Sequence, residues 1–200
     1  MNTVDQLPRI FQANVDRFYK HVILVTQGQL RTHGTLLVGR ADTMDEFQDQ
    51  CAAQVDNHTT NEAAKAFALT LDGIFERQLS RWAREQRVKA KTWDNLLSSC
   101  AQKANLDIAA VGMASDFKEL HLVANVVRHG EGKSCRELKA FASQLWDIPA
   151  QNYYDLAPSP TPLSEEIRIS SDDLRRYVRS IVRFWGHVDP LPMAVREPPY

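Results

Sequence analysis

Apolar residues recur at every third or fourth position through most of the chain, which is the spacing of one face of an α-helix. Residues 7–25 carry one such stripe, and Pro8 suits the first turn of a helix. Residues 43–57 open with a Thr-x-x-Glu capping box and predict a second helix. Residues 61–88 hold the longest helical pattern, with the apolar positions Phe67, Leu71, Ile74, Phe75 and Leu79.

The helical pattern continues through the second half of the chain. Residues 93–104 predict a short helix, and residues 117–129 predict a longer, central and largely buried one, capped by Asp116. Gly130 marks the end of this buried helix, because glycine takes a positive φ without a Cβ clash. A Ser-x-x-Glu capping box then predicts a further helix over residues 134–145.

Three prolines interrupt this pattern and favour an extended, poorly helical segment, because proline lacks the backbone donor that a helix needs. These prolines are Pro158, Pro160 and Pro162. We therefore expect a helical bundle over residues 1–150, a proline-rich linker over residues 151–165 and a C-terminal arm over residues 166–200. The arm is expected to contain one helix, residues 170–186, and an irregular tail. The fold class is all-α.

Composition narrows the class of protein. The chain of 200 residues is 44% hydrophobic and 24% charged, as in a soluble domain that buries a sizeable core. A net charge of -1 gives no overall attraction to nucleic acid or to an anionic membrane, so such binding needs a local basic patch. The sequence has neither the form of a signal peptide nor an apolar run long enough to span a bilayer. We therefore expect a cytoplasmic protein that contacts no membrane.

Motifs for metals and cofactors are missing from the sequence. Cys51, Cys100 and Cys135 are widely spaced, which matches neither a zinc site nor a disulfide framework. There is no Gly-rich phosphate loop, no HExxH and no GxSxG nucleophile elbow. We expect neither a metal nor a cofactor.

Two groups of arginines each share one helix face. They are Arg77, Arg81 and Arg84 in the longest helix, and Arg176, Arg179 and Arg183 in the last helix. Each group predicts either a surface that contacts phosphates or an ordinary solvated helix face. The first group is a candidate for substrate binding.

Chemically reactive side chains are densest around the end of the helix of residues 117–129. Asn125 and His129 are four residues apart and share one side of that helix, with Arg128 beside them. Lys133 follows in the loop. Two interpretations stay open here. Cations in the last turn stabilise the negative end of the helix dipole, and the same groups can hold a substrate and move a proton.

The run from Asn125 to Gly130, followed by Gly132 and Ser134, resembles a motif of the HEPN superfamily (higher eukaryotes and prokaryotes nucleotide-binding domains). The resemblance implies a helical bundle, often dimeric, and in many members a metal-independent ribonuclease of toxin–antitoxin, abortive-infection or antiviral systems. His129 would match the motif histidine, and Asn125 lies near the polar position of the motif. Four to six residues separate the motif arginine from the histidine, which puts the arginine at position 122, 123 or 124. These positions are apolar: Leu122, Val123 and Ala124.

RNA is cut without a metal when a base assists the ribose 2′-hydroxyl and an acid protonates the leaving oxygen. His129 is the candidate acid–base residue, Arg128 would hold phosphate oxygens, and Asn125 would orient the imidazole or a phosphate oxygen. Lys133 and the arginines at positions 77, 81 and 84 would bind the substrate. Because one copy supplies few such groups, we expect a homodimer in which two helix ends share one cleft.

Two hypotheses of other classes compete with this one. In the first, the chain is a non-catalytic HEPN-like subunit that binds a nucleotide, RNA or a protein partner, such as an antitoxin or a defence-system protein. In the second, it is a structural subunit whose C-terminal arm docks on a partner through Tyr177, Ile181 and Trp185. The missing motif arginine favours both of these over catalysis.

Overall fold

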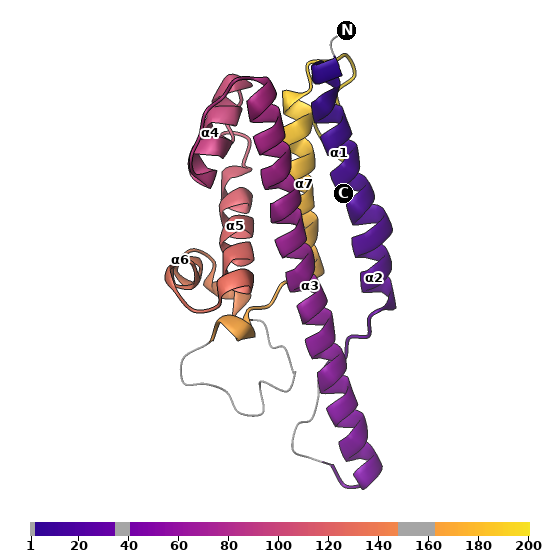
Figure 1. The fold of residues 1–200 in the computed structure, drawn as a ribbon. Helices are drawn as coiled ribbons and strands as arrows, with labels where there is room; N and C mark the ends of the chain where they lie inside the picture. The colour runs from indigo at the N-terminus through magenta and orange to yellow at the C-terminus, as the bar shows by residue number, and fades with distance from the viewer. Residues whose placement is uncertain (1–2, 35–40, 148–162) are drawn as a thin grey trace.

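The computed structural model describes residues 3–34, 41–147 and 163–200, and no β-strand occurs among them. The α-helices run in the order α1 Leu7–Phe18, α2 Leu24–Gln29, α3 Met44–Glu85, α4 Trp93–Lys103, α5 Ala114–His129, α6 Lys133–Phe141 and α7 Ser171–Val188 (Figure 1). The predicted all-α class is confirmed. The predicted proline-rich linker lies outside the described residues, apart from its last few positions.

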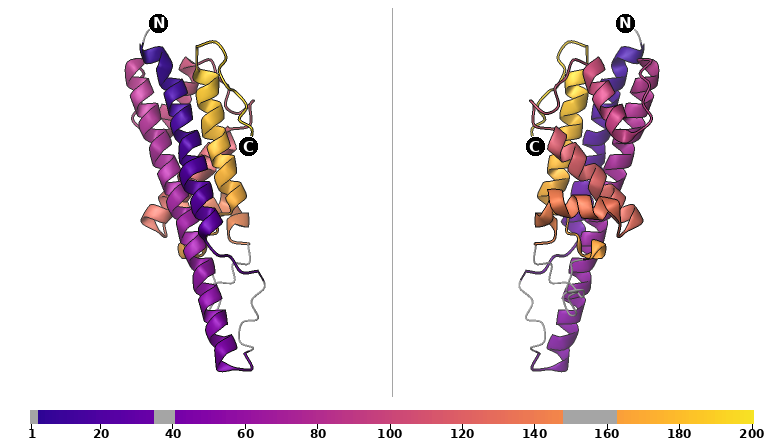
Figure 2. Two further views of the ribbon diagram at one scale, coloured as in Figure 1. Left: turned by 90° about the vertical axis from the view of Figure 1, so that its right-hand side faces the viewer. Right: turned by 90° about the vertical axis from the view of Figure 1, so that its left-hand side faces the viewer.

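Four long helical segments form the bundle. The continuous helix of α1 and α2 packs against α7, α3 packs against both α5 and α7, and α5 also contacts α7 (Figures 1 and 2). The short helices α4 and α6 pack on α3 and α5 respectively. At the centre, Phe75 of α3 stacks on Phe117 of α5 at 4.8 Å between ring centroids, and Phe184 of α7 meets both edge-on. Aromatic pairs of this kind add about 0.5–1.5 kcal/mol each beyond the area that they bury.

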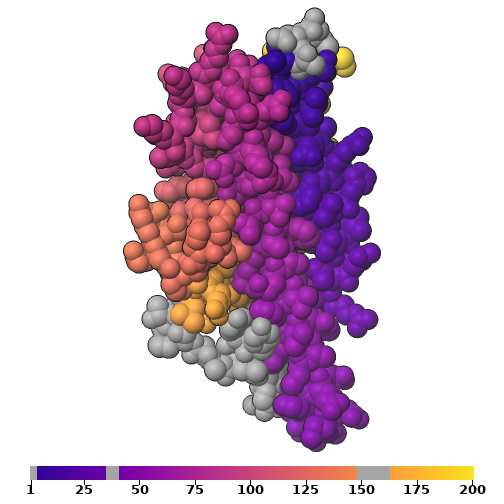
Figure 3. Space-filling model, viewed as in Figure 1, coloured from indigo at the N-terminus to yellow at the C-terminus, as the bar shows by residue number. Residues whose placement is uncertain are grey.

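Helix α3 is one helix of 42 residues, where the sequence pattern predicted two. The stretch between the predicted helices, residues 58–60, holds no proline or glycine, so the backbone hydrogen bonds of the helix continue through it. The predicted start is confirmed, since the Thr43 hydroxyl accepts the Glu46 N–H at 3.2 Å. The first turns of α3 project beyond the rest of the bundle (Figures 1 and 3).

The last helix is part of the bundle core and not a separate arm. Tyr177, Ile181 and Trp185 are each fully buried. The Trp185 indole N–H donates to the Gln78 side-chain oxygen at 2.7 Å, which links α7 to α3. The apolar stripe that the sequence showed therefore faces α1, α3 and α5, and the hypothesis that these residues dock on a partner is wrong.

Two predicted helix caps are also wrong. Helix α5 begins at Ala114, before Asp116, whose carboxylate instead accepts from Arg176 at 2.6 Å and from the Ser180 hydroxyl. Helix α6 begins at Lys133 with no side-chain cap, ahead of the predicted capping serine. The predicted end of α5 is confirmed, because Gly130 has a φ of 69° and donates its N–H to the Val126 carbonyl at 2.8 Å.

The tail after α7 is irregular, as predicted, and folds back along α1. The Gln12 amide donates to the Val195 carbonyl at 2.6 Å, and the Tyr200 hydroxyl donates to Asp16 at 2.8 Å. Gly186 permits this path, because a Cβ at that position would lie 1.9 Å from the Val195 oxygen. Across the described residues, no helix is long and apolar enough to cross a membrane.

Candidate functional site

The end of α5 presents the predicted motif residues at the surface. Arg128 and His129 are exposed, and within the described part of the chain neither has a hydrogen-bond or ion-pair partner. Asn125, one turn earlier, is half-buried. Lys133 is highly exposed at the start of α6, with its ammonium 3.6 Å from the Glu137 carboxylate. Among the residues that the structure places, Arg128 is therefore a cation without a carboxylate partner, beside an accessible imidazole.

The apolar positions ahead of His129 lie in the core. Ala124 and Val123 have no solvent exposure, and Leu122 is 7% exposed. An arginine at position 124 would have to enter the packed interior of the bundle, where an unpaired charge is strongly unfavourable. The end of α5 therefore lacks the arginine of the HEPN ribonuclease motif in sequence, and the positions where that arginine would stand are buried.

The arginines of α3 lie apart from the end of α5. Lys65 of α3 lines the same cavity as Gly130, and Arg77 follows it by twelve residues, or about 18 Å at 1.5 Å per residue. Arg77, Arg81 and Arg84 are all exposed, and the Arg81 guanidinium lies 3.4 Å from Glu85. The structure thus does not bring this predicted substrate-binding group to the predicted catalytic residues.

The arginines of α7 are neutralised by carboxylates. Arg176 bonds to Asp116 at 2.6 Å, to Asp173 at 3.0 Å and to Glu119. Arg179 and Arg183 lie 3.3 and 2.9 Å from the same carboxylate, which belongs to Glu197. This face is therefore a network of ion pairs that fastens α7 to α5 and to the tail, and its charge is not free for a phosphate.

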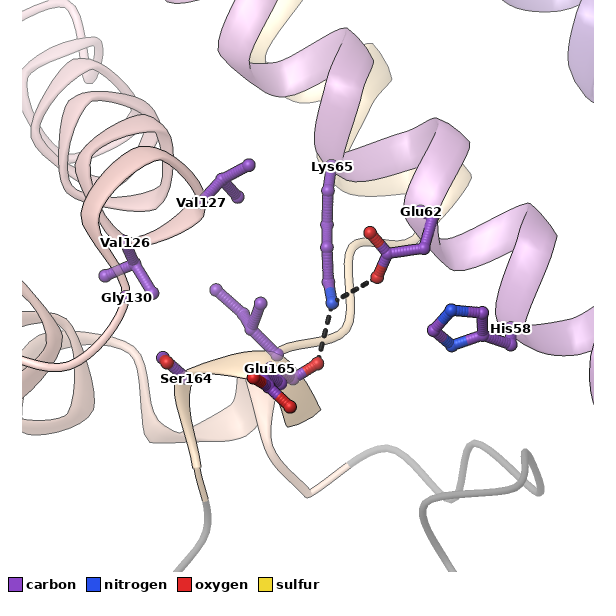
Figure 4. Close-up of a pocket in the computed structure, with 9 residues that line it drawn as sticks. His58, Glu62, Lys65, Val126, Val127, Gly130, Ser164 and Glu165 are labelled. Carbon is purple, nitrogen blue, oxygen red and sulfur yellow. Dashed lines mark hydrogen bonds and ion pairs between the residues drawn. The ribbon is translucent and has the colours of Figure 1, made fainter.

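A cavity of about 360 Å³ lies between α3, the end of α5 and the turn at residues 164–166 (Figure 4). Lys65 reaches into this space from α3 and is buried; its ammonium donates to Glu62 at 2.7 Å and to the Glu165 carbonyl at 2.6 Å. His58 lines the same space, and burial lowers the pKa of its imidazole. The lysine here is already paired, so the cavity offers less free positive charge than the surface around Arg128.

A second cavity, of about 380 Å³, lies between α4, α5 and α6 and is partly open to solvent. His121 of α5 lines it, and the Nδ1 atom of His121 lies 3.2 and 3.3 Å from the two carboxylate oxygens of Asp72. Asp72 is 1% exposed. The Trp93 ring stacks on the imidazole at 4.2 Å with 11° between the planes. Asn125 lines this cavity as well, and so one predicted motif residue belongs here.

Sequence reasoning missed the Asp72–His121 pair because the two residues are 49 positions apart. One signal was present: Asp72 directly follows Leu71 and lies among the core positions of the longest helix, where a charged residue needs a partner. A carboxylate that holds one imidazole nitrogen fixes the ring and leaves the other nitrogen for a ligand or a proton. No cluster of three metal-binding side chains occurs in the ranges that the structure describes.

The fold and these sites define the class as an all-α helical bundle with an exposed basic helix end and a carboxylate–histidine pair in a cavity. Comparisons of the chain with protein-family models, curated proteins and solved structures gave no match. Function is therefore argued from the side chains themselves.

Proposed function

We propose that the chain is a HEPN-like protein that binds RNA through the C-terminal end of α5, as a subunit of a toxin–antitoxin or antiviral defence system. The observation that carries this proposal is the exposed pair of Arg128 and His129, whose side chains have no protein partner among the described residues. A guanidinium without a carboxylate partner retains its full capacity for two parallel hydrogen bonds to a phosphate.

Local charge supports RNA as the ligand. The chain as a whole carries a charge of -1, so attraction to a polyanion must come from a local patch. Arg128 and His129 end α5, and Lys133 begins α6 after a three-residue loop. Lys133 contributes less because it pairs with Glu137, and the Glu131 carboxylate of the loop accepts the Ser164 N–H. Arg128 is therefore the main source of attraction in this patch. By contrast, Arg176 is surrounded by carboxylates and has no comparable capacity for phosphate.

Binding without cleavage is the form of this function that the geometry favours. The position of the motif arginine nearest to His129 is Ala124, which is fully buried, so one copy of the chain shows no arginine–histidine pair of the cleaving kind. The metal-independent endonuclease is the second candidate, because His129 is solvent-exposed and an imidazole can move a proton near neutral pH.

A homodimer fits both forms of the proposal. One α5 end offers a single arginine and a single imidazole, whereas two ends related by a two-fold axis would double the charge along one RNA strand. An antitoxin or another defence-system protein would then cover the same ends to control access.

The test is incubation of the purified protein with mixed RNAs in a chelator, analysed on native and denaturing gels for wild type and His129→Ala. We expect wild type to shift the RNA on the native gel and to leave it intact on the denaturing gel. His129→Ala should keep the wild-type melting temperature, because the side chain is exposed and a helix-end histidine contributes only about 0.3–1 kcal/mol.

The other outcomes separate the candidates. Cleavage that His129→Ala abolishes would establish the endonuclease in place of simple binding. A wild-type protein that neither shifts nor cuts RNA at tens of micromolar would contradict both forms of the proposal.

A further inference from the structure

The Asp72–His121 pair lies away from the exposed end of α5 and has no part in the function proposed above. Asp72 is almost fully buried, and within the described ranges His121 is its hydrogen-bonding partner. When Nδ1 carries the proton and donates it to Asp72, the Nε2 atom becomes a hydrogen-bond acceptor. The stacked Trp93 ring holds the imidazole plane, so the acceptor is preorganised.

The walls of this cavity combine an apolar body with polar groups. Trp93 and Leu97 of α4 and Ile108 of the following turn give apolar surface, while Asn125 of α5 and Ser134 of α6 give hydrogen-bonding groups. A cavity of about 380 Å³ lies within the volume range of small-molecule binding sites. It is too small to hold a folded segment of a protein or nucleic acid.

The charged groups around the cavity determine whether it attracts a cationic or an anionic ligand. Three of these groups are carboxylates: Asp72 behind the imidazole, Asp94 in the first turn of α4 and Glu137 of α6. Two ammonium groups oppose them: Lys118, which lies 4.5 Å over the Phe141 ring, and Lys133, which pairs with Glu137. Three carboxylates against two ammonium groups leave an excess of negative charge around the cavity, which attracts a cation and repels phosphates and carboxylates.

We propose that this cavity binds a small primary amine with a flat apolar body. The apolar body lies against Trp93 and Leu97, and the ammonium group donates a hydrogen bond to His121 Nε2 in the field of Asp94 and Glu137. The buried Asp72 carboxylate holds His121 in the tautomer that accepts this bond. Asn125 adds a hydrogen-bonding group on the same helix face, one turn after His121.

The test uses three probes of similar size and different charge: benzylamine, benzyl alcohol and benzoate. Binding to the full chain at neutral pH is measured by calorimetry and by the shift of the His121 ring resonances in NMR spectra. We expect benzylamine to bind with the highest affinity and to shift the His121 signals, benzyl alcohol to bind more weakly, and benzoate not to bind.

Variants at exposed carboxylates keep the test independent of folding. Asp94→Asn and Glu137→Gln change surface residues, so both proteins should fold, and each should weaken benzylamine binding a few-fold. Glu165→Gln, which removes an exposed carboxylate at the other cavity, is the matched control and should leave the affinity unchanged. Asp72→Asn should weaken binding further, because the amide no longer fixes the histidine tautomer.

Two results would overturn the inference. The first is benzoate binding as tightly as benzylamine. The second is the absence of any shift in the His121 resonances when benzylamine is added at millimolar concentration to folded wild-type protein. Neither result bears on RNA binding at the end of α5, so the two proposals stand or fall separately.

Discussion

Replacing Arg176 by methionine perturbs the ion-pair network that fastens α7 to α5. The guanidinium donates to Asp116 at 2.6 Å, to Asp173 at 3.0 Å and to Glu119. Glu119 is only 5% exposed and also accepts the Tyr177 hydroxyl at 2.6 Å. Methionine keeps much of the volume of the arginine stem and removes the charge, so Glu119 would stay buried without its cation.

The magnitude follows from the burial of the two partners. Removing one partner of a fully buried ion pair costs about 3–5 kcal/mol, whereas an exposed pair is worth about 0–1 kcal/mol. The Arg176 side chain is 35% exposed and the Glu119 side chain 6% exposed, so the network lies between these limits and nearer the first. We expect a loss of about 2–3 kcal/mol in the free energy of unfolding. For a chain of this size, that corresponds to a fall of about 4–12 °C in melting temperature.

The assay is urea unfolding followed by circular dichroism and tryptophan fluorescence. The matched control is Arg175→Met, one residue earlier, whose ion pair with Asp172 is exposed on both sides and should change stability by less than about 1 kcal/mol. Adding Glu119→Gln to Arg176→Met should recover part of the lost stability, because the buried charge is then gone. A loss below about 1 kcal/mol for Arg176→Met, equal to that of Arg175→Met, would refute this reasoning.

Three further predictions concern the tail, a thiol and an acid-sensitive contact. Gly186→Ala should lose about 1–3 kcal/mol and release the tail to proteases, since the new Cβ would collide with the Val195 carbonyl; unchanged proteolysis would contradict this. Burial raises the pKa of Cys100 to about 12, so iodoacetamide at pH 8 should label the exposed Cys51 and spare Cys100, as mass spectrometry would show. A backbone N–H of the turn at residues 164–166 lowers the pKa of Glu131 below its ordinary 4.5. The ionised carboxylate therefore stabilises the fold above pH 4.5, and this stabilisation is lost as the pH falls through the lowered pKa. Glu131→Gln should have a lower melting temperature than wild type at pH 7 and the same melting temperature near pH 2. A difference in melting temperature that does not change with pH would contradict this.

The helices were predictable because their signals are local. Apolar spacing located the helical segments, Thr43 marked the start of α3, and the positive φ of Gly130 ended α5 where expected. Two caps were wrongly predicted. Asp116 has the form of a helix cap, but a carboxylate with an arginine within reach gains more from that partner than from a backbone N–H. Ser134 also has the form of a cap, but α6 already begins at Lys133, one residue before it.

Placement of whole elements and pairing across them could not be read from spacing. An apolar helix face has the same residue spacing whether it packs against a partner protein or against its own bundle. Only the structure, in which α7 packs against α1, α3 and α5, shows that this face belongs to the core. At the candidate site, the exposure of His129 follows from its place before Gly130. The Asp72–His121 pair depends on the antiparallel approach of α3 and α5, which no local pattern encodes.

The measurement that tests the central claim most directly is the RNA affinity of Arg128→Gln against Arg77→Gln. Fluorescence anisotropy with a labelled single-stranded RNA, in chelator and at several salt concentrations, gives the dissociation constant and its salt dependence. Both arginines are exposed helix residues, so neither substitution should affect folding. We predict that Arg128→Gln weakens binding about three- to tenfold and lowers the salt slope by about one phosphate contact, while Arg77→Gln matches wild type. Equal affinity for wild type and Arg128→Gln, or a loss confined to Arg77→Gln, would contradict the assignment of the RNA site to the end of α5.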